Sequence, residues 1–116
     1  RSIVASIQGT LTIDIIREQG LMDNAVERGR DLRERLRAGV PDSVLEEVRG
    51  KGLMIGVEFD TKERREAVQR TAFENGLLTL GAGYSTIRLL PPLDVTEREV
   101  EIGAEAFVEA VESTLS

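Results

Sequence analysis

The sequence predicts an α+β fold, in which a small, mostly antiparallel sheet of three or four strands is covered by helices. Apolar residues recur at helical spacing at both ends of the chain, and an alternating run follows the Gly-Lys-Gly tripeptide at 50–52. Two more short apolar runs lie between residues 77 and 90. The 116 residues are expected to form a single domain over 1–116.

Two helices are predicted at the start of the chain, over residues 3–19 and 23–38, with Gly20 as the break between them. The first is apolar on more than one side, which is typical of a helix buried between two layers. We therefore expect part of it to face a partner surface. The apolar positions of the two helices are Ile3, Val4, Ile7, Leu11, Ile13, Ile15 and Ile16, then Ala25, Gly29, Leu32 and Leu36.

A β-hairpin is predicted over residues 44–49 and 53–59, on either side of the tripeptide at 50–52. Its second strand alternates strictly, so one face is expected to be buried and the other open. Glu58 falls on the open face. The predicted inward positions are Leu53, Ile55, Val57 and Phe59.

The second half of the chain predicts a helix, two strands and a final helix. Asp60 or Thr61 can cap a helix over 62–75, which Gly76 ends. Strands follow over 77–80 and 85–90, joined by a loop at 81–84. Thr96 and Glu99 form a capping box for the last helix. Its predicted inner face is Val100, Ala104, Phe107, Val108, Val111 and Leu115, and its solvated face is Glu101, Glu105, Glu109 and Glu112.

The composition excludes several kinds of chemistry. The chain has no cysteine and no histidine, which removes disulfides, thiolate catalysis, Ser-His and Cys-His pairs and the usual metal ligands. A net charge of -6 argues against nucleic-acid and membrane partners. No apolar run has membrane-spanning length, and we expect a cytoplasmic protein. No metal site and no catalytic residue is predicted within this chain.

Neither glycine motif fits a nucleotide-binding loop. The spacing around Gly50 and Gly52 is wrong for a Walker loop, and a tight turn with an exposed lysine is the better interpretation. The second motif lies between two strands, where the dinucleotide fingerprint needs a strand and a helix. We expect this loop, Gly81, Ala82, Gly83 and Tyr84, at the edge of a binding site.

Arg88 is the most suggestive single residue, because it interrupts an apolar run just before Pro91 and Pro92. Its guanidinium needs solvent, a buried acidic partner or a ligand carboxylate, with which it can form two parallel charge-assisted hydrogen bonds. From the residues alone, an arginine that faces solvent from a strand is somewhat favoured over an arginine that binds a ligand carboxylate. Covalent amine chemistry has two candidates at most, Lys51 and Lys62, because the other thirteen of the fifteen basic residues are arginines.

Three segments resemble class III pyridoxal-phosphate aminotransferases. Residues 48–58, VRGKGLMIGVE, resemble the hairpin of that family's C-terminal small domain. Residues 87–93, IRLLPPL, followed by Asp94-Val95-Thr96, are similar to its final strand and helix start. Residues 14–25 are similar to its opening helices. The family includes 4-aminobutyrate, acetylornithine and ornithine aminotransferases, and related amino-acid racemases share the fold.

The resemblance implies a C-terminal small domain of a larger enzyme, with the large domain absent from this chain. In such enzymes the large domain carries the Schiff-base lysine, so pyridoxal 5'-phosphate is expected in the intact enzyme only, and neither Lys51 nor Lys62 matches that lysine. Arg88 matches the arginine that grips a substrate carboxylate. The loop at 81–84 matches a segment near the substrate entrance. The implied partners are the large domain, amino-acid and 2-oxo-acid substrates, and a second subunit in a homodimer.

One departure lies at the start, where Ser2-Ile3 stands in place of the family's usual Asn-Pro. The leading hypothesis is a transaminase that moves an amino group from an amino acid or an omega-amine, such as 4-aminobutyrate, to a 2-oxo acid, with this chain inactive alone. A racemase or epimerase of the same fold is the second. A non-enzymatic α+β module that binds a partner through its first helix is the third.

Overall fold

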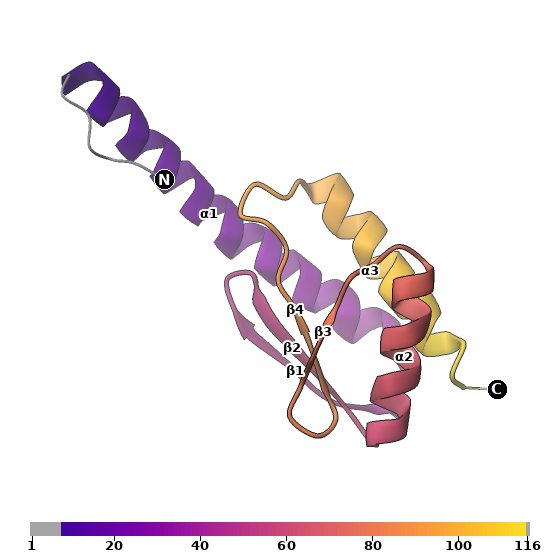
Figure 1. The fold of residues 1–116 in the computed structure, drawn as a ribbon. Coiled ribbons are helices and arrows are strands. Elements are labelled where there is room, and N and C mark those ends of the chain that lie inside the picture. The colour runs from indigo at the N-terminus through magenta and orange to yellow at the C-terminus, as the bar shows by residue number, and fades with distance from the viewer. Residues whose placement is uncertain (1–7, 116) are drawn as a thin grey trace.

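The computed structural model describes residues 8–115, with side chains described from residue 18 onward. Three helices lie on one face of a four-stranded sheet in which every strand pair is antiparallel (Figure 1). This confirms the predicted α+β class with a small helix-covered sheet. The opposite face of the sheet is covered by none of these helices, and we call it the outer face.

Helix α1 runs without a break over Gln8–Gly39, so the two helices predicted here are one and the predicted stop at Gly20 is wrong. Gly20 has an ordinary helical backbone with a negative φ, and an interior glycine costs a helix only about 1 kcal/mol relative to alanine. The 32 residues make a rod about 48 Å long. Its N-terminal part extends beyond the sheet (Figure 1). The predicted start at Ile3, the Ser2-Ile3 departure and the apolar side chains before residue 18 lie outside what the structure describes.

The predicted hairpin is confirmed as strands β1, Leu45–Lys51, and β2, Met54–Phe59. The tight turn falls at Gly52 and Leu53, slightly later than predicted, because Lys51 still pairs with Met54. Gly52 has a φ of 56°. That is the left-handed value needed at the first central position of a type II′ turn, and glycine adopts it without steric cost.

Helix α2, Lys62–Glu74, begins at Thr61, whose Oγ1 accepts a hydrogen bond from the Arg64 amide at 3.0 Å. It ends in a Schellman motif. The Leu77 amide donates to the Ala72 carbonyl at 2.8 Å, and Gly76 has a φ of 89°. Because this motif uses the residues directly after the helix, the strand predicted over 77–80 is wrong. Strand β3 is the shorter and later segment Leu80–Ala82.

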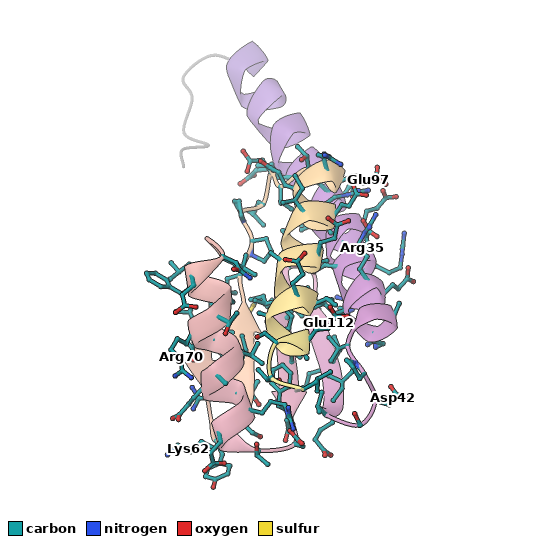
Figure 2. All side chains as sticks on the ribbon, turned by 90° about the vertical axis from the view of Figure 1, so that its right-hand side faces the viewer. Arg35, Asp42, Lys62, Arg70, Glu97 and Glu112 are labelled. Carbon is teal, nitrogen blue, oxygen red and sulfur yellow. The ribbon has the colours of Figure 1, made fainter. Side chains whose placement is uncertain are left out.

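Strand β4, Thr86–Leu89, completes a sheet of order β1-β2-β4-β3. Helix α3, Glu97–Glu112, lies between α1 and α2 on the covered face (Figure 2). The hydrophobic core between the layers includes Phe59 and Phe107, whose ring centroids are 6.2 Å apart. Leu115, predicted on the inner face of the last helix, is 44% exposed because the helix ends before it.

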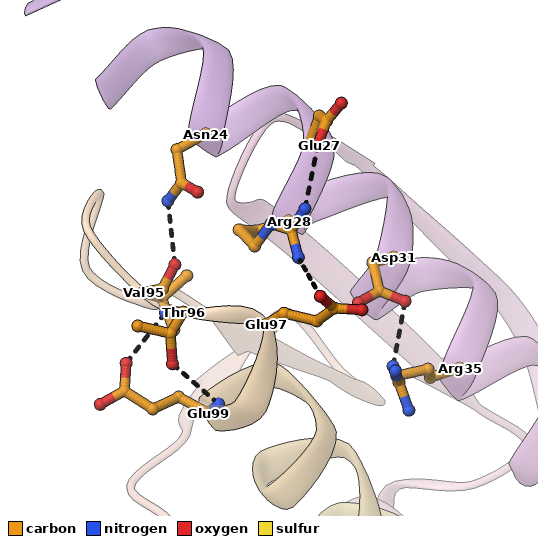
Figure 3. A network of polar contacts seen from close by, with 9 residues as sticks. All are labelled: Asn24, Glu27, Arg28, Asp31, Arg35, Val95, Thr96, Glu97 and Glu99. Atoms are coloured by element: carbon orange, nitrogen blue, oxygen red, sulfur yellow. Dashed lines mark hydrogen bonds and ion pairs between the residues drawn. The ribbon is translucent and has the colours of Figure 1, made fainter. Parts of the chain in front are cut away.

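A polar network joins the start of α3 to α1 (Figure 3). Thr96 and Glu99 form the predicted capping box, in which each side chain accepts a hydrogen bond from the other residue's amide. The side-chain amide of Asn24 donates to the carbonyl of Val95 at 2.9 Å. The loop before α3 is therefore fixed both by its own helix and by α1.

Replacing Thr96 by alanine should lower the free energy of unfolding by about 1 kcal/mol, the usual cost of losing an N-cap hydroxyl. Denaturant unfolding of the two proteins measures this loss. Thr96→Ser keeps the hydroxyl and should stay within a few tenths of a kcal/mol of the parent. An equal loss in both variants would assign the effect to the threonine methyl group instead.

Helix α1 approaches the β1–β2 turn very closely at Gly29. A Cβ atom built at Gly29 would lie against the Gly52 carbonyl oxygen and 2.6 Å from its carbonyl carbon. Arg33 Nη1 donates to the same carbonyl oxygen at 3.3 Å, and Arg37 Nη2 donates to the Val48 carbonyl at 2.8 Å. The hairpin is thus held against α1 by backbone contact at a position where no side chain fits.

Arg64 ties α2 to the end of α3. Its Nε donates to Asp60 at 2.7 Å, and its Nη1 donates to the carbonyl and hydroxyl oxygens of Thr114 at 3.1 and 3.0 Å. The hydrogen bond from Arg64 lowers the pKa of the Asp60 carboxyl below its ordinary value. Asp60 therefore stays ionised, and paired, as the pH falls toward its ordinary titration range.

Candidate functional site

The outer face of the sheet carries the polar side chains of the strands. On β4, Ile87 and Leu89 are buried toward the helices and Arg88, between them, is exposed on the outer face. On β2, Ile55 and Val57 point inward in the same way. Since successive side chains of a strand point to opposite faces, one pattern fixes both the core and this polar surface.

Arg88 lies in one row with residues from the three other strands. It pairs with Gly56 on β2 and with Leu80 on β3, and Gly56 pairs in turn with Arg49 on β1. Arg49, Gly56, Arg88 and Leu80 therefore cross the sheet side by side on its outer face. The row places one arginine on each side of the glycine.

An open hollow of about 610 Å³ lies on this face, and we call it the outer hollow. Its size is within the range of small-molecule sites. It is bordered by the hairpin on one side and by the β3–β4 turn on the other. Its lining residues are Arg49, Gly50, Lys51, Met54, Ile55, Gly56, Ala82, Gly83, Thr86 and Arg88.

The outer hollow is positively charged, although the chain as a whole carries a charge of -6. It is lined by Arg49, Lys51 and Arg88 and by no acidic side chain among the described residues. Glu58 and Glu47, just outside it, bind Arg49 Nη1 at 2.9 and 3.3 Å. Lys51 and Arg88 make no ion pair or side-chain hydrogen bond to any residue in the described part of the chain. The hollow therefore offers two cationic groups to an anionic ligand.

The predicted loop at 81–84 is divided by the structure. Gly81 and Ala82 belong to β3, and the turn comprises Gly83, Tyr84 and Ser85. Ala82 and Gly83 line the outer hollow, whereas the place of a Cβ at Gly81 is taken by Arg65 Nη1 from α2. Tyr84 is 72% exposed. The part of this segment that borders the hollow is therefore its turn end.

The side chains that the structure describes, from residue 18 onward, do not form a pyridoxal-phosphate site. Such a site needs a lysine for the imine and an anionic partner for the pyridine nitrogen, in a sheltered pocket. Lys51 and Lys62 are both exposed. Lys62, the first residue of α2, does not line the outer hollow. No aspartate or glutamate lines the hollow with Lys51 among the described residues. The donor set fits an anion, not the cofactor.

Other parts of the described structure are weaker candidates for a functional site. An apolar pocket of about 360 Å³ lies where α3 meets the Pro91–Pro92 segment, and its one charged residue, Glu99, is used in the capping box. Within residues 8–115, no three of the acidic side chains that are described, from residue 18 onward, gather as a metal site. No helix in that range combines the length and apolarity needed to cross a membrane.

Sequence reasoning identified Arg88 but missed Arg49 and Gly56 as its neighbours. Alternation along β2 and β4 indicates which side chains share a face. It does not indicate that β4 pairs with β2, because this pairing crosses α2 and β3 in the chain. Glu58 was correctly predicted on the open face, and its ion pair with Arg49 was not predicted.

The chain is similar in sequence to known aminotransferases and to a racemase. The family model described as aminotransferase class-III matches residues 3–111. An acetylornithine aminotransferase of Archaeoglobus fulgidus is 42% identical over 97 residues, which cover 84% of this chain and 24% of that protein. An alanine/serine racemase of Pyrococcus horikoshii is 35% identical over 97% of this chain and 26% of that protein.

A solved structure of similar fold is the lysine aminotransferase of M. tuberculosis in the internal aldimine form. It matches with a TM-score of 0.74 and 31% identity, over 91% of this chain and 24% of that one. The chain thus spans about a quarter of the length of the proteins it matches.

Proposed function

Because this chain belongs to the class-III aminotransferase family, we propose that it forms the C-terminal small domain of a pyridoxal-phosphate enzyme that transfers an amino group to a 2-oxo acid. The observation that supports this most is the family match over 3–111, together with a span of about a quarter of the relatives' length. The cofactor would be held by the remaining part of the enzyme, since the residues here do not fit it.

In this proposal Arg88 binds the carboxylate of the amino-acid or oxo-acid substrate. Its exposed guanidinium has no partner among the described residues and lies in a hollow without acidic side chains. Two parallel hydrogen bonds from one guanidinium fix both the position and the plane of a carboxylate. Substrate held in this way presents its reacting carbon in one orientation, which is the main contribution that a positioning residue makes to rate. Residues 81–84 would lie at the substrate entrance.

The amino donor is proposed to carry its amine at the end of a chain, remote from the bound carboxylate. Relatives named for acetylornithine and lysine support this class of donor. A shorter donor of the same class, 4-aminobutyrate, is also included. Assay of the intact enzyme with each donor and a 2-oxo acid tests the proposal, and failure of every donor to yield the amino acid of the acceptor would contradict it.

We expect the purified 116-residue chain to bind no pyridoxal phosphate as an imine and to transaminate nothing. Both lysines are exposed, and the groups that would hold the cofactor are absent from the outer hollow. Absorption spectra of the chain mixed with the cofactor measure imine formation, with the intact enzyme as the positive control. A stable aldimine band from the isolated chain, lost in Lys51→Arg, would show that this domain carries the cofactor lysine.

Racemisation is the second candidate, and the alanine/serine racemase at 35% identity favours it. A carboxylate clamp serves both reactions equally. Intact enzyme incubated with one L-amino acid and no 2-oxo acid separates them, because a racemase forms the D-isomer and a transaminase requires the acceptor.

We further propose that the intact enzyme is a cytoplasmic homodimer. Sedimentation of the intact enzyme tests the dimer, and cell fractionation tests the location.

A further inference from the structure

We propose that Arg65 of α2 is a positioning residue for the outer hollow, because it holds the β3–β4 turn that borders this hollow. The inference rests on the proposed function in one respect, since the hollow must bind substrate for the effect to reach activity. It adds a residue from the covered side of the sheet, which itself touches no substrate. Three observations support it: the contacts of Arg65 around β3, the exposed position of that strand, and the glycine beneath the guanidinium.

Arg65 and Gln69 join α2 to both ends of β3. Arg65 Nη2 donates to the backbone carbonyl of Tyr84, in the turn after β3, at 3.4 Å. Its Nη1 donates to Gln69 Oε1 at 3.1 Å, and the Gln69 side-chain amide donates to the carbonyl of Thr79, just before β3, at 3.3 Å. The edge strand and its turn are therefore attached to the helical layer at two points.

Strand β3 needs such support because it is short and lies at the edge of the sheet. It comprises three residues, none of them buried, and pairs with β4 alone in the described sheet. Exposed segments of this kind open at low free-energy cost. The far end of the turn is fixed independently, since the Ser85 carbonyl accepts a hydrogen bond from the Phe59 amide at 2.9 Å. Arg65 thus holds the half of the turn that follows β3, where Ala82 and Gly83 line the outer hollow.

Gly81 makes room for the guanidinium. It pairs with Ile87, which is buried toward the helices, so a side chain at 81 would point to the same side of the sheet. Its place is taken by Arg65 Nη1, with Gln69 Oε1 at 3.3 Å from the position of the Cβ. The φ of Gly81 is not in the left-handed region, so the backbone does not require glycine here. The contact with Arg65 is what an added side chain would disturb.

Arg65 can be displaced at small cost to the rest of the domain. Its Nη1 is the end of a flexible side chain, so a methyl group at 81 can push it aside without moving backbone. Its Nε is buried and has no hydrogen-bond partner in the described part of the chain, which is unfavourable. Gly81→Ala should therefore release the turn while the core keeps its packing.

Hydrogen exchange of the intact enzyme, followed by mass spectrometry, measures the turn directly. In Arg65→Ala and Gly81→Ala, peptides containing residues 83–85 should exchange about threefold to tenfold faster, the factor expected for the loss of one hydrogen bond. Exchange in α1 and α3 should stay at the parent level. Arg70, on the same helix, makes no hydrogen bond within the described structure, so Arg70→Ala is the control and should change nothing.

Steady-state kinetics of the same variants measure the consequence for substrate. A site that is competent only part of the time binds with an apparent affinity reduced by that fraction. The KM of Arg65→Ala should therefore rise about threefold to tenfold, with kcat within about twofold of the parent. Arg65→Lys keeps the charge but not the planar fork, so it should give an intermediate KM.

The double variant tests whether the two substitutions remove the same contact. Because Gly81→Ala acts by displacing Arg65, the double variant should match Arg65→Ala and should not show the sum of both effects. Additive effects would overturn the proposal. So would parent-like exchange at 83–85 in either single variant, or faster exchange throughout the sheet.

Arg88→Ala separates this inference from the proposed function. If Arg65→Ala loosens the turn and raises KM while Arg88→Ala leaves kinetics unchanged, the positioning role stands and the proposed role of Arg88 is wrong. If Arg65→Ala loosens the turn without raising KM while Arg88→Ala lowers kcat/KM, the proposed function stands and the positioning role is wrong. Unchanged kinetics in both variants would overturn both.

Discussion

If Arg88 binds the substrate carboxylate as proposed above, replacing it by alanine in the intact enzyme should lower kcat/KM by about 30-fold or more, since removing a charged partner from a bound carboxylate typically costs about 2–5 kcal/mol. Arg88 is exposed on the outer face and makes no ion pair or side-chain hydrogen bond to the residues that the structure describes. The loss should therefore appear in kinetics and not in stability. Steady-state kinetics with amino donor and 2-oxo acid, together with thermal unfolding of the same samples, measure the two effects separately.

Two further variants sharpen this prediction. Arg88→Lys keeps the charge but not the planar fork, so it should recover only part of the activity. Arg70→Ala removes another exposed arginine, which points away from the body on α2 (Figure 2), and should leave kinetics unchanged. Parent-like kinetics for Arg88→Ala would exclude this residue from the substrate site. A large fall in its melting temperature would indicate a structural role.

Gly29→Ala should destabilise the protein by roughly 1–3 kcal/mol, the usual range for overpacking, although glycine to alanine normally stabilises a helix. The new methyl group would meet the backbone carbonyl of Gly52, which cannot rotate away as a side chain can. Either α1 or the hairpin must move. Denaturant unfolding of the parent and variant chains measures the change.

Gly20→Ala is the matched control, because it makes the same substitution in the same helix at a position with nothing within 4 Å of the Cβ. It should stabilise the chain by up to about 1 kcal/mol. The pair thus isolates the contact with the hairpin from helix propensity. Stabilisation by both variants would show that α1 and the hairpin turn are further apart than the structure places them.

Sequence predicted best where the signals are local. The Thr96 capping box, the stop at Gly76 and the alternation of β2 each depend on residues close together in the chain, and each is confirmed. The break at Gly20 was predicted from propensity alone. Its cost to a helix is only about 1 kcal/mol, too little to interrupt one that continues for several turns on either side.

The errors around β3 have a different origin. The run 77–80 is apolar, as a short strand would be, but the Schellman motif after α2 uses Leu77 as its closing residue. Leu77 then packs against the core, and pairing with β4 begins only at Leu80. Two physical explanations suit the same apolar residues, and only the tertiary structure decides between them.

Predicting the candidate site from the sequence would have required the strand order. The sequence and the family resemblance identified Arg88, and its role stays a prediction. The neighbouring Arg49 comes from a strand that is adjacent only through β2, and the β2–β4 pairing joins residues about thirty positions apart. No local pattern encodes that pairing, so the two-arginine row could not be predicted.

The alternation of β2 and β4 also has an evolutionary consequence. Residues that form the core and residues that line the outer hollow come from the same strands but point to opposite faces. Substitutions at 49, 56, 58 and 88 therefore leave the aliphatic interior untouched, and their effects should add to those of substitutions in that interior. The chemistry of the outer face can therefore change one residue at a time while the core keeps its stability, so one fold can present outer faces of different charge and shape.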